Sequence, residues 1–249
     1  MALRKRLLDA VHSNEYIKRV LFNPFAEYHQ WRLLGFVRDA AHEIGAGGSV
    51  IDIGAGELKY RSQFSHCRYV SNDLCVGDEG WNYEGIDLVS SAYAIPVEDD
   101  SFDAVLCIQV MEHLDNPDGA FREFHRILKG RGRAYVSAPL LAGEHQQPHD
   151  FLRYTRYGFS VLGERNGFRV LSISPHGGCA IAVETLMWAA FWELAPLPRQ
   201  SLARYAVYVL LYPVKLLTGA LALLLDMLDK KKSMTINYNV VYEKVVSDC

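Results

Sequence analysis

The chain has 249 residues, of which 50% are hydrophobic, so it is long enough for one domain with a full apolar core. Its 26 basic and 29 acidic residues give a net charge of −3. This argues against nucleic acid as the main partner, because such proteins carry a basic excess. Five scattered cysteines without a C-x-x-C pair predict neither a zinc site nor a disulfide framework, and no metal site is predicted. Reduced thiols and the absence of an apolar signal-peptide core predict a cytoplasmic protein.

The amino-terminal region is expected to be helical from about residue 5 to residue 45. Apolar positions recur there at three- and four-residue steps, as at Leu33, Leu34, Val37 and Ala41. Asn23-Pro24 breaks the pattern into two pieces. Residues 1–48 are therefore predicted to form an amino-terminal helical segment.

Five short apolar segments follow, and each ends near polar or turn residues as strands do. They cover residues 49–54, 68–74, 85–91, 102–109 and 132–139. Between the last two, Phe121, Phe124, Ile127 and Leu128 share one side of a predicted helix that Gly130 ends. Strands alternating with helices predict an α/β fold with a Rossmann-like, doubly wound, mostly parallel sheet.

The carboxyl-terminal third contains a long apolar insertion. Residues 168–174 and 235–244 are expected to close the sheet as an antiparallel strand pair. The predicted sheet domain is therefore made of residues 49–174 and 235–249, and the helical insertion is residues 175–234. Part of it is long enough to span a bilayer, but Pro213 and Lys215 argue against that.

Two interpretations of the insertion stay open. In the favoured one, its helices pack on the domain, cover the pocket or form a dimer face. In the other, its tryptophans and tyrosines lie at headgroup depth and Lys230–Lys232 lie near anionic lipid, so that the protein is peripheral at the inner face of the membrane.

The stretch "VIDIGAGELKY" at residues 50–60 predicts a ligand-binding turn. Gly54 and Gly56 follow a buried strand, but Lys59 stands where a dinucleotide fingerprint has its third glycine. A ligand without phosphate, such as S-adenosylmethionine, removes part of the need for that glycine. Asp73, at the end of the second strand, can accept hydrogen bonds from both ribose hydroxyls. The alternative is a tight turn with a solvated acid at a strand end.

The region "SSAYAIPVEDDSFDAVLCIQVMEHLDNPDGAFREFHRILKGRG" extends this pattern. Together with "VIDIGAG" and "SNDL", the chain resembles the class I S-adenosylmethionine-dependent methyltransferases of the type-11 branch, over residues 50–140. The family's L-P-F-x-D-x-S-F-D-x-V, E-H and R-x-L-K-x-G-G patterns read here as "IPVEDDSFDAV", "EH" and "RILKGRG". The resemblance implies an enzyme with S-adenosylmethionine as its cofactor.

The resemblance also assigns cofactor contacts at the carboxyl ends of the strands. Asp52 and the Gly54–Ala55–Gly56 loop would contact the methionine part, and Asp73 with Leu74 would bind the ribose. Ser91 and Ala92, or their neighbour Tyr93, would border the adenine, and the backbone of Gln109 would approach the sulfonium end. The chain departs from the family at two of these places. Leu58 stands at the last glycine of the methyltransferase loop, and Ser91 stands where an acid is common.

Methyl transfer is an in-line displacement, so alignment matters most and a base is needed only if the acceptor must lose a proton. Candidate catalytic residues lie in "LLAGEHQQPHDFLRYT" after the fifth strand: His145, His149 and Asp150. This segment resembles the H-x-x-P-x-D-[Y/F]-x-R-[Y/F]-T pattern of bacterial methyltransferases associated with surface glycan or glycolipid assembly. Alternatively, Asp150 and Arg153 only close the loop, Thr155 caps the next helix, and His113 braces its own loop.

The predicted function is methyl transfer from S-adenosylmethionine to a small-molecule, glycan or glycolipid acceptor. A nicotinamide-dependent oxidoreductase is disfavoured by the missing third glycine. A non-catalytic, methyltransferase-like subunit associated with a membrane or an assembly stays open, because Leu58 and Ser91 depart from the family pattern.

Overall fold

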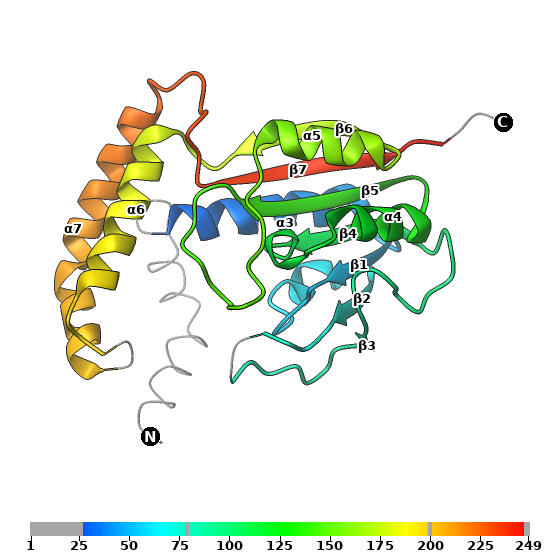
Figure 1. Ribbon diagram of the computed structural model, residues 1–249, viewed down its shortest axis with the longest axis horizontal. Helices are drawn as coiled ribbons and strands as arrows, with labels where there is room; N and C mark the ends of the chain where they lie inside the picture. The colour runs from blue at the N-terminus through cyan, green and yellow to red at the C-terminus, as the bar shows by residue number, and fades with distance from the viewer. Residues whose placement is uncertain (1–26, 78–79, 199–200, 247–249) are drawn as a thin grey trace. The chain divides into compact units, whose positions relative to one another are not determined.

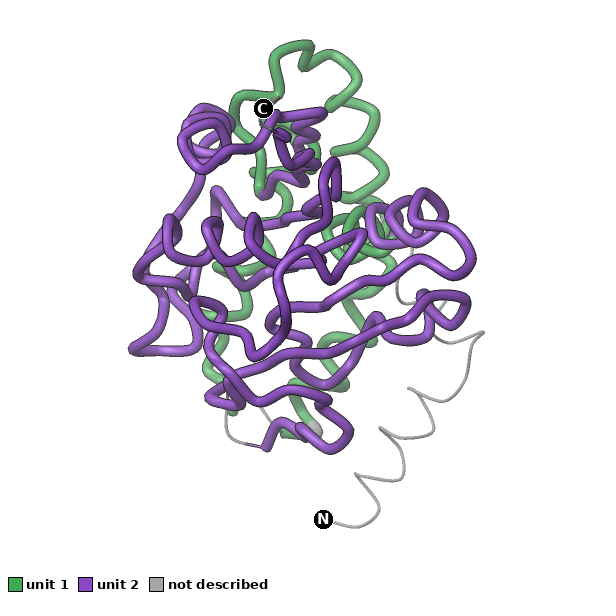
Figure 2. The backbone as a smooth tube through the Cα atoms, turned by 90° about the vertical axis from the view of Figure 1, so that its right-hand side faces the viewer, with its two compact units in different colours: residues 1–34, 176–236 green, residues 35–175, 237–249 purple. Residues whose placement is uncertain are grey.

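The computed structural model describes residues 27–77, 80–198 and 201–246. The expected helix before residue 27, with its break at Asn23-Pro24, lies outside these residues. Backbone contacts divide the chain into two units, one of residues 1–34 and 176–236 and the other of residues 35–175 and 237–249 (Figure 2). We call them the helical unit and the sheet unit.

The sheet unit contains a seven-stranded sheet in the order β3-β2-β1-β4-β5-β7-β6 (Figure 1). The strands are β1 (Ser49–Ile53), β2 (Arg68–Asp73), β3 (Leu88–Val89), β4 (Phe102–Ile108), β5 (Leu128–Pro139), β6 (Phe168–Pro175) and β7 (Asn237–Lys244). The first five pair in parallel, whereas β7 lies antiparallel between β5 and β6. The predicted fold class, with its antiparallel final strand, is confirmed.

Apolar side chains cover both faces of the sheet. Helices α4 (Pro117–Ile127) and α5 (Arg156–Arg165) supply Phe121, Phe124 and Phe159 to a core that includes Ala134 and Val136 of β5. Side chains alternate along a strand, so Tyr135 faces the other way. It meets α3 (Tyr28–Ile44), where its hydroxyl donates to Glu43 Oε2 at 2.8 Å. The sheet is therefore doubly wound.

Two boundaries differ from the sequence prediction for local reasons. Helix α4 ends at Ile127 and not at Gly130, because Leu128 is extended, fully buried and already paired with Phe102 of β4. Strand β3 covers two residues and not seven. Asp87, just before it, accepts from the backbone N–H and the hydroxyl of Ser71 at 2.9 and 2.7 Å. The Asp87 side chain thus takes the hydrogen bond that a backbone carbonyl of a longer β3 would accept from β2.

The helical unit contains α6 (Cys179–Leu194) and α7 (Leu202–Asp226), which pack against each other. We call this pair the hairpin. Lys215 of α7 bonds Glu184 of α6 at 3.1 Å, and Trp188 donates to Thr218 at 3.0 Å. Both charged side chains are nearly buried, at 14% and 11% exposed. Lys215 therefore lies on the inner side of the hairpin, and α7 continues through Pro213.

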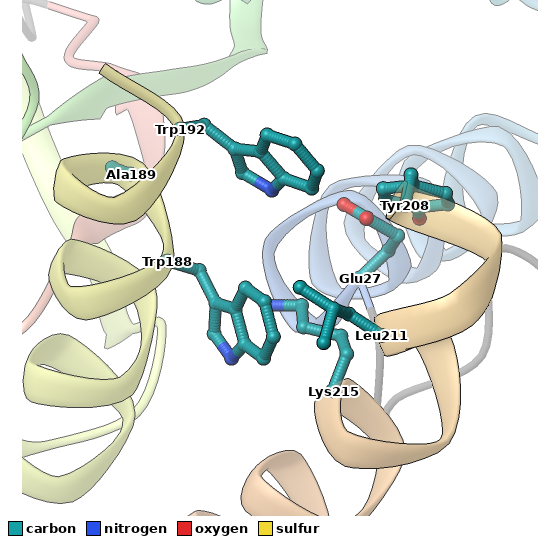
Figure 3. A pocket seen from close by; sticks show the side chains of 7 residues that line it. All are labelled: Glu27, Trp188, Ala189, Trp192, Tyr208, Leu211 and Lys215. Atoms are coloured by element: carbon teal, nitrogen blue, oxygen red, sulfur yellow. The ribbon is translucent and has the colours of Figure 1, made fainter. Parts of the chain in front are cut away.

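The same inner side encloses a cavity of about 210 Å³ (Figure 3). Side chains from both helices and Glu27 point into it: Glu27, Trp188, Trp192, Tyr208, Leu211 and Lys215. Burial raises the pKa of Glu27. All these residues belong to the helical unit, and none is among the predicted cofactor or catalytic residues.

The outer side of the hairpin is apolar. The stretch Ala203–Asp226 has a mean hydropathy of 1.9 and is long and apolar enough to cross a membrane, yet only 11% of it is buried. Its exposed side chains include a stripe at helical spacing: Leu210, Val214, Leu217, Leu221 and Leu224.

Candidate functional site

The turn after β1 needs glycine at two positions. Gly54 has φ +74° and lies against Val110, where an added Cβ would be 2.3 Å from Cγ2. Gly56 has φ +50°, and a Cβ there would lie 3.1 Å from the ring of Trp81. Any side chain at Gly54 would therefore displace Val110, which lies in the loop after β4.

Leu58 adopts the left-handed backbone, with φ +58°, although it is not a glycine. Glycine is the residue that takes this conformation without strain. The loop thus keeps the conformation that the family's last glycine would permit, and the substitution leaves the turn in place. This weakens the argument from Leu58 for a degenerate fold.

Asp73 ties the end of β2 to the glycine turn. Its Oδ2 accepts from the backbone N–H of Gly56 at 2.8 Å, and its Oδ1 accepts from that of Cys75 at 2.6 Å. A carboxylate offers about four lone-pair sites, so acceptor capacity is left for ligand hydroxyls. Leu74 beside it is exposed.

Asp52, by contrast, is buried beneath the turn, with 2% of its surface exposed. Its Oδ2 accepts from the Tyr69 hydroxyl at 2.6 Å. Burial raises the pKa of Asp52 from 3.8 to about 7, while the Tyr69 hydrogen bond lowers it. The Asp52 side chain thus joins β1 to β2 just before the turn.

The loop after β3 carries the residues predicted for the adenine. Ser91 Oγ accepts from the backbone N–H of Tyr93 at 3.2 Å, and Ala92 lies between them. The Tyr93 hydroxyl donates to Asp115 Oδ1 at 2.7 Å and accepts from the Asn116 N–H at 3.2 Å. Tyr93 therefore connects this loop to the segment after β4.

Gln109 follows β4 with φ +58°, a strained conformation for a residue that is not glycine. Its side chain turns toward β5 and β7 and donates to Ser137 Oγ at 3.2 Å and Asn237 Oδ1 at 2.9 Å. With its side chain held there, the cofactor contact predicted for Gln109 would have to come from its backbone.

Three side chains converge just beyond Gln109: Glu112, His113 and His145. We call them the Glu-His-His cluster. Glu112 and His113 lie in the short helix η2 (Met111–His113), and His145 comes from the loop after β5. The Nε2 atoms of both histidines lie 3.9 Å from Glu112 Oε1, and the two rings meet edge-on with centroids 4.8 Å apart. Burial raises the pKa of Glu112 to about 8 and lowers the pKa of His113.

Asp150 and Arg153 hold the loop that carries His145. Arg153 donates to both oxygens of Asp150, at 2.6 and 2.7 Å, and the backbone N–H of His145 donates to Asp150 Oδ2 at 3.0 Å. The Arg153 guanidinium holds the pKa of Asp150 well below its ordinary value. His149 is exposed and contributes its carbonyl to His113 Nδ1 at 2.6 Å, so its ring is not part of the cluster. Thr155 Oγ1 caps α5, as predicted.

The hydrogen-bonding groups at the carboxyl ends of the parallel strands fit a nucleoside joined to an amino acid. A strand-end carboxylate with free acceptor capacity, a glycine turn packed under Trp81 and an aromatic Tyr93 loop all lie at the carboxyl ends of β1 to β4. In parallel α/β sheets, this edge is where ligands bind.

Sequence reasoning missed two parts of this edge. Trp81 packs on Gly56 of the glycine turn, and the hydroxyl of the neighbouring Tyr83 accepts from Gly77 N at 2.6 Å. The sequence "GWNYEG" gave a signal, since two aromatics in a polar loop are unusual there. Glu112 was named only within the "EH" pattern, although an acid inside the apolar stretch "VLCIQVMEHL" already indicates a special environment.

Comparisons with known proteins agree with this geometry. Residues 51–136 match a family described as a methyltransferase domain. The methyltransferase GfsG of Streptomyces halstedii is 27% identical over 154 residues, which cover 57% of this chain and 55% of that protein. The chain thus matches about half the length of this curated relative. The resemblance inferred over residues 50–140 is confirmed.

Solved structures share the fold. A SAM-dependent methyltransferase from Archaeoglobus fulgidus is 14% identical with a TM-score of 0.55, covering 93% of this chain and 100% of its own. The [4+2]-cyclase SpnF is 19% identical with a TM-score of 0.54, covering 87% of this chain and 81% of its own. Because a cyclase shares the architecture, chemistry has to be argued from the site.

The buried Asp52 predicts a pH effect on stability. Its pKa is about 7 in the folded chain and near 3.8 when unfolded, so the folded form holds a proton that the unfolded form loses. Relative to Asp52→Asn, which keeps an acceptor for Tyr69, the free energy of unfolding should fall as the pH rises from about 4 to about 7, by at most about 1.4 kcal/mol per unit, and then level off. Denaturant titrations at several pH values measure this, and parallel profiles for the two proteins would contradict it.

Proposed function

Since residues 51–136 belong to a class I S-adenosylmethionine-dependent methyltransferase domain, we propose that this chain transfers a methyl group to a small-molecule or glycan acceptor. S-adenosylmethionine is the cofactor of this domain. When bound, it supplies a methyl group whose carbon bonds to the acceptor's lone pair while the carbon–sulfur bonding pair stays on sulfur.

The observation that carries the proposal is the coupling of Asp73 to the glycine turn. The 2.8 Å hydrogen bond from Gly56 N to Asp73 Oδ2 fixes a carboxylate beside the backbone of the turn. We assign the ribose hydroxyls to Asp73, the methionine part to the turn Gly54–Gly56 and the adenine to the Ser91–Tyr93 loop. Asp52, predicted to face the methionine part, is bonded to Tyr69 of the neighbouring strand.

The acceptor side is assigned to the Glu-His-His cluster. Val110, which packs on Gly54, directly precedes the helix η2 that carries Glu112 and His113. Cofactor turn and cluster are thus adjacent, as alignment of acceptor and methyl requires. A hydroxyl acceptor would lose its proton here, and His145, whose side chain is 41% exposed, is the group a substrate can reach. Asp150 positions the ring of His145, while a role for His149 stays a prediction.

We further propose that the hairpin binds a lipid surface, which suits a glycan or glycolipid acceptor. Lys215, which argued against a membrane-spanning helix, lies on the inner side, paired with Glu184. The outer stripe of leucines is exposed, with Leu210 and Leu217 at 75% and 71%. Lys230 and Lys231, exposed after α7, match anionic headgroups in charge. An apolar face that is exposed within the described residues and followed by two lysines suits an anionic bilayer surface.

Replacement of Asp73 should weaken cofactor binding. Asp73→Asn keeps an acceptor for Gly56 N but loses the charge that strengthens hydrogen bonds from ribose hydroxyls, so we expect the Kd for S-adenosylmethionine to rise by at least about tenfold. Calorimetric titration measures it, with Asp100→Asn, an exposed acid elsewhere, as control. Unchanged affinity would refute the ribose assignment. Absence of binding by the unmodified chain would favour the non-catalytic subunit.

The acceptor class is tested with S-adenosylmethionine carrying a labelled methyl group. We expect the purified chain to move label into the lipid and glycan fractions of a cell-envelope extract, and His145→Ala to lower turnover more than cofactor affinity. Label that enters only the soluble metabolite fraction would exclude the glycan acceptor and retain a small molecule. No transfer into either fraction, with cofactor bound, would contradict the activity itself.

Lipid binding is tested by co-sedimentation with phosphatidylcholine vesicles, with and without phosphatidylserine. The unmodified chain should sediment, and more so with the anionic lipid. The double variant Leu210→Glu, Leu217→Glu should lose at least about tenfold in partitioning, because each exposed leucine contributes roughly 1.5–3 kcal/mol when buried. Val89→Glu, at an exposed position of β3, serves as control. A chain that stays in the supernatant and dimerises through this face would show that a second copy covers it.

A further inference from the structure

The ligand-type atoms of the Glu-His-His cluster lie close enough to share one ion. One carboxylate oxygen and one nitrogen from each histidine lie within 4.8 Å of one another. They come from two segments, the helix η2 after β4 and the loop after β5. We propose that Glu112, His113 and His145 form a binding site for a divalent transition-metal ion.

Glu112 gives the first independent support. Its side chain is fully buried, and neither carboxylate oxygen has a hydrogen-bond partner within the described residues. A buried carboxyl group whose oxygens have no hydrogen-bond partner is costly in either protonation state. Its backbone carbonyl accepts from Phe151 N at 2.8 Å and Leu152 N at 3.2 Å, so the backbone that carries this side chain is held by the loop after β5. A cation between Glu112 and the histidines would supply the missing partner.

The orientation of the two imidazoles gives the second support. His113 Nδ1 lies 2.6 Å from the His149 carbonyl oxygen, and His145 Nδ1 lies 3.1 Å from that of Gly143 and 3.4 Å from Asp150 Oδ2. These partners only accept, so each Nδ1 carries the proton and donates it. Each Nε2 is then left with a lone pair, and both face Glu112. Metal-binding histidines are held in this way by carbonyls and carboxylates.

The donor set narrows the kind of ion. Two imidazole nitrogens and one carboxylate oxygen suit Mn²⁺, Fe²⁺, Co²⁺ or Zn²⁺ better than Mg²⁺ or Ca²⁺, which prefer oxygen. Three protein ligands leave positions open for water or a substrate oxygen. Gln109 is not a fourth ligand here, since its amide is engaged by Ser137 and Asn237. The inference departs from the sequence prediction, which contained no metal site.

The ion would define the acceptor class, and this part rests on the proposed function. A divalent ion lowers the pKa of a bound hydroxyl, so an oxygen acceptor would reach the methyl group as an alkoxide or phenolate. Its proton would pass to solvent, because His145 Nε2 is then a ligand while part of its ring stays exposed. Acceptor nitrogens, which carry a free lone pair, have no such need.

The test is a titration of the metal-free full-length chain with Co²⁺ and with Zn²⁺, without cofactor or acceptor. We expect one ion per chain and a visible Co²⁺ absorption. His113→Ala, His145→Ala and Glu112→Gln should each weaken binding by at least about tenfold, and Asp150→Asn, which loosens His145, by about 10–100-fold. His149→Ala is the matched control, because it removes a neighbouring imidazole but keeps the carbonyl that holds His113. Thermal denaturation confirms that each variant is folded.

Two results would overturn the inference. One is an unmodified chain that binds neither ion more tightly than the His113→Ala variant. The other is a loss in His149→Ala as large as that in His145→Ala. Either can occur with cofactor binding intact, which leaves the proposed methyl transfer standing. Conversely, tight metal binding by a chain that does not bind S-adenosylmethionine would retain the site and refute the function.

Discussion

The close packing of Gly54 against Val110 is the constraint on which the rest of the site depends. An added Cβ would lie 2.3 Å from Val110 Cγ2, so the turn after β1 and the segment after β4 pack in direct contact. Asp73 holds the far side of the same turn through Gly56. The glycine turn is therefore fixed from two neighbouring strands, and the short helix with Glu112 and His113 is fixed with it.

The pattern "IPVEDDSFDAV … RILKGRG" is explained by hydrogen bonds that hold the fold more than by ligand contact. Arg126 of α4 bonds Glu123, Asp99 and the carbonyls of Ile95 and Val97, while Glu123 accepts from Ile95 N at 2.6 Å. These bonds anchor the loop that leads from the Ser91–Tyr93 segment back into β4. A family motif read from sequence can thus support the cofactor loop indirectly, through one arginine and one glutamate.

Sequence predicts those features that depend on local chemistry. The buried strands appear as apolar runs, and their predicted bounds differ from the observed ones by a residue or so at β1, β2 and β4. Sequence-based prediction fails where a contact with a residue far along the chain sets the bounds of an element. Asp87 shortens β3 by bonding Ser71, and Leu128 enters the sheet because Phe102 pairs with it. Likewise, nothing local distinguishes His149 from His113; the folding of the loop after β5 decides which ring meets His145.

The buried acids of the chain show how this protein treats charge in its interior. Asp52 accepts from Tyr69, Glu123 is paired with Arg126, Asp150 with Arg153, and Asp226 with Lys232. Even in the apolar hairpin, Glu184 is matched by Lys215 across the two helices. Within the described residues, Glu112 is the buried carboxylate that this rule does not cover. A buried acid without a partner does not stabilise the fold, so the presence of Glu112 at this position is better explained by function. The two imidazole nitrogens 3.9 Å from its Oε1 indicate that the missing partner is a cation that all three side chains can bind.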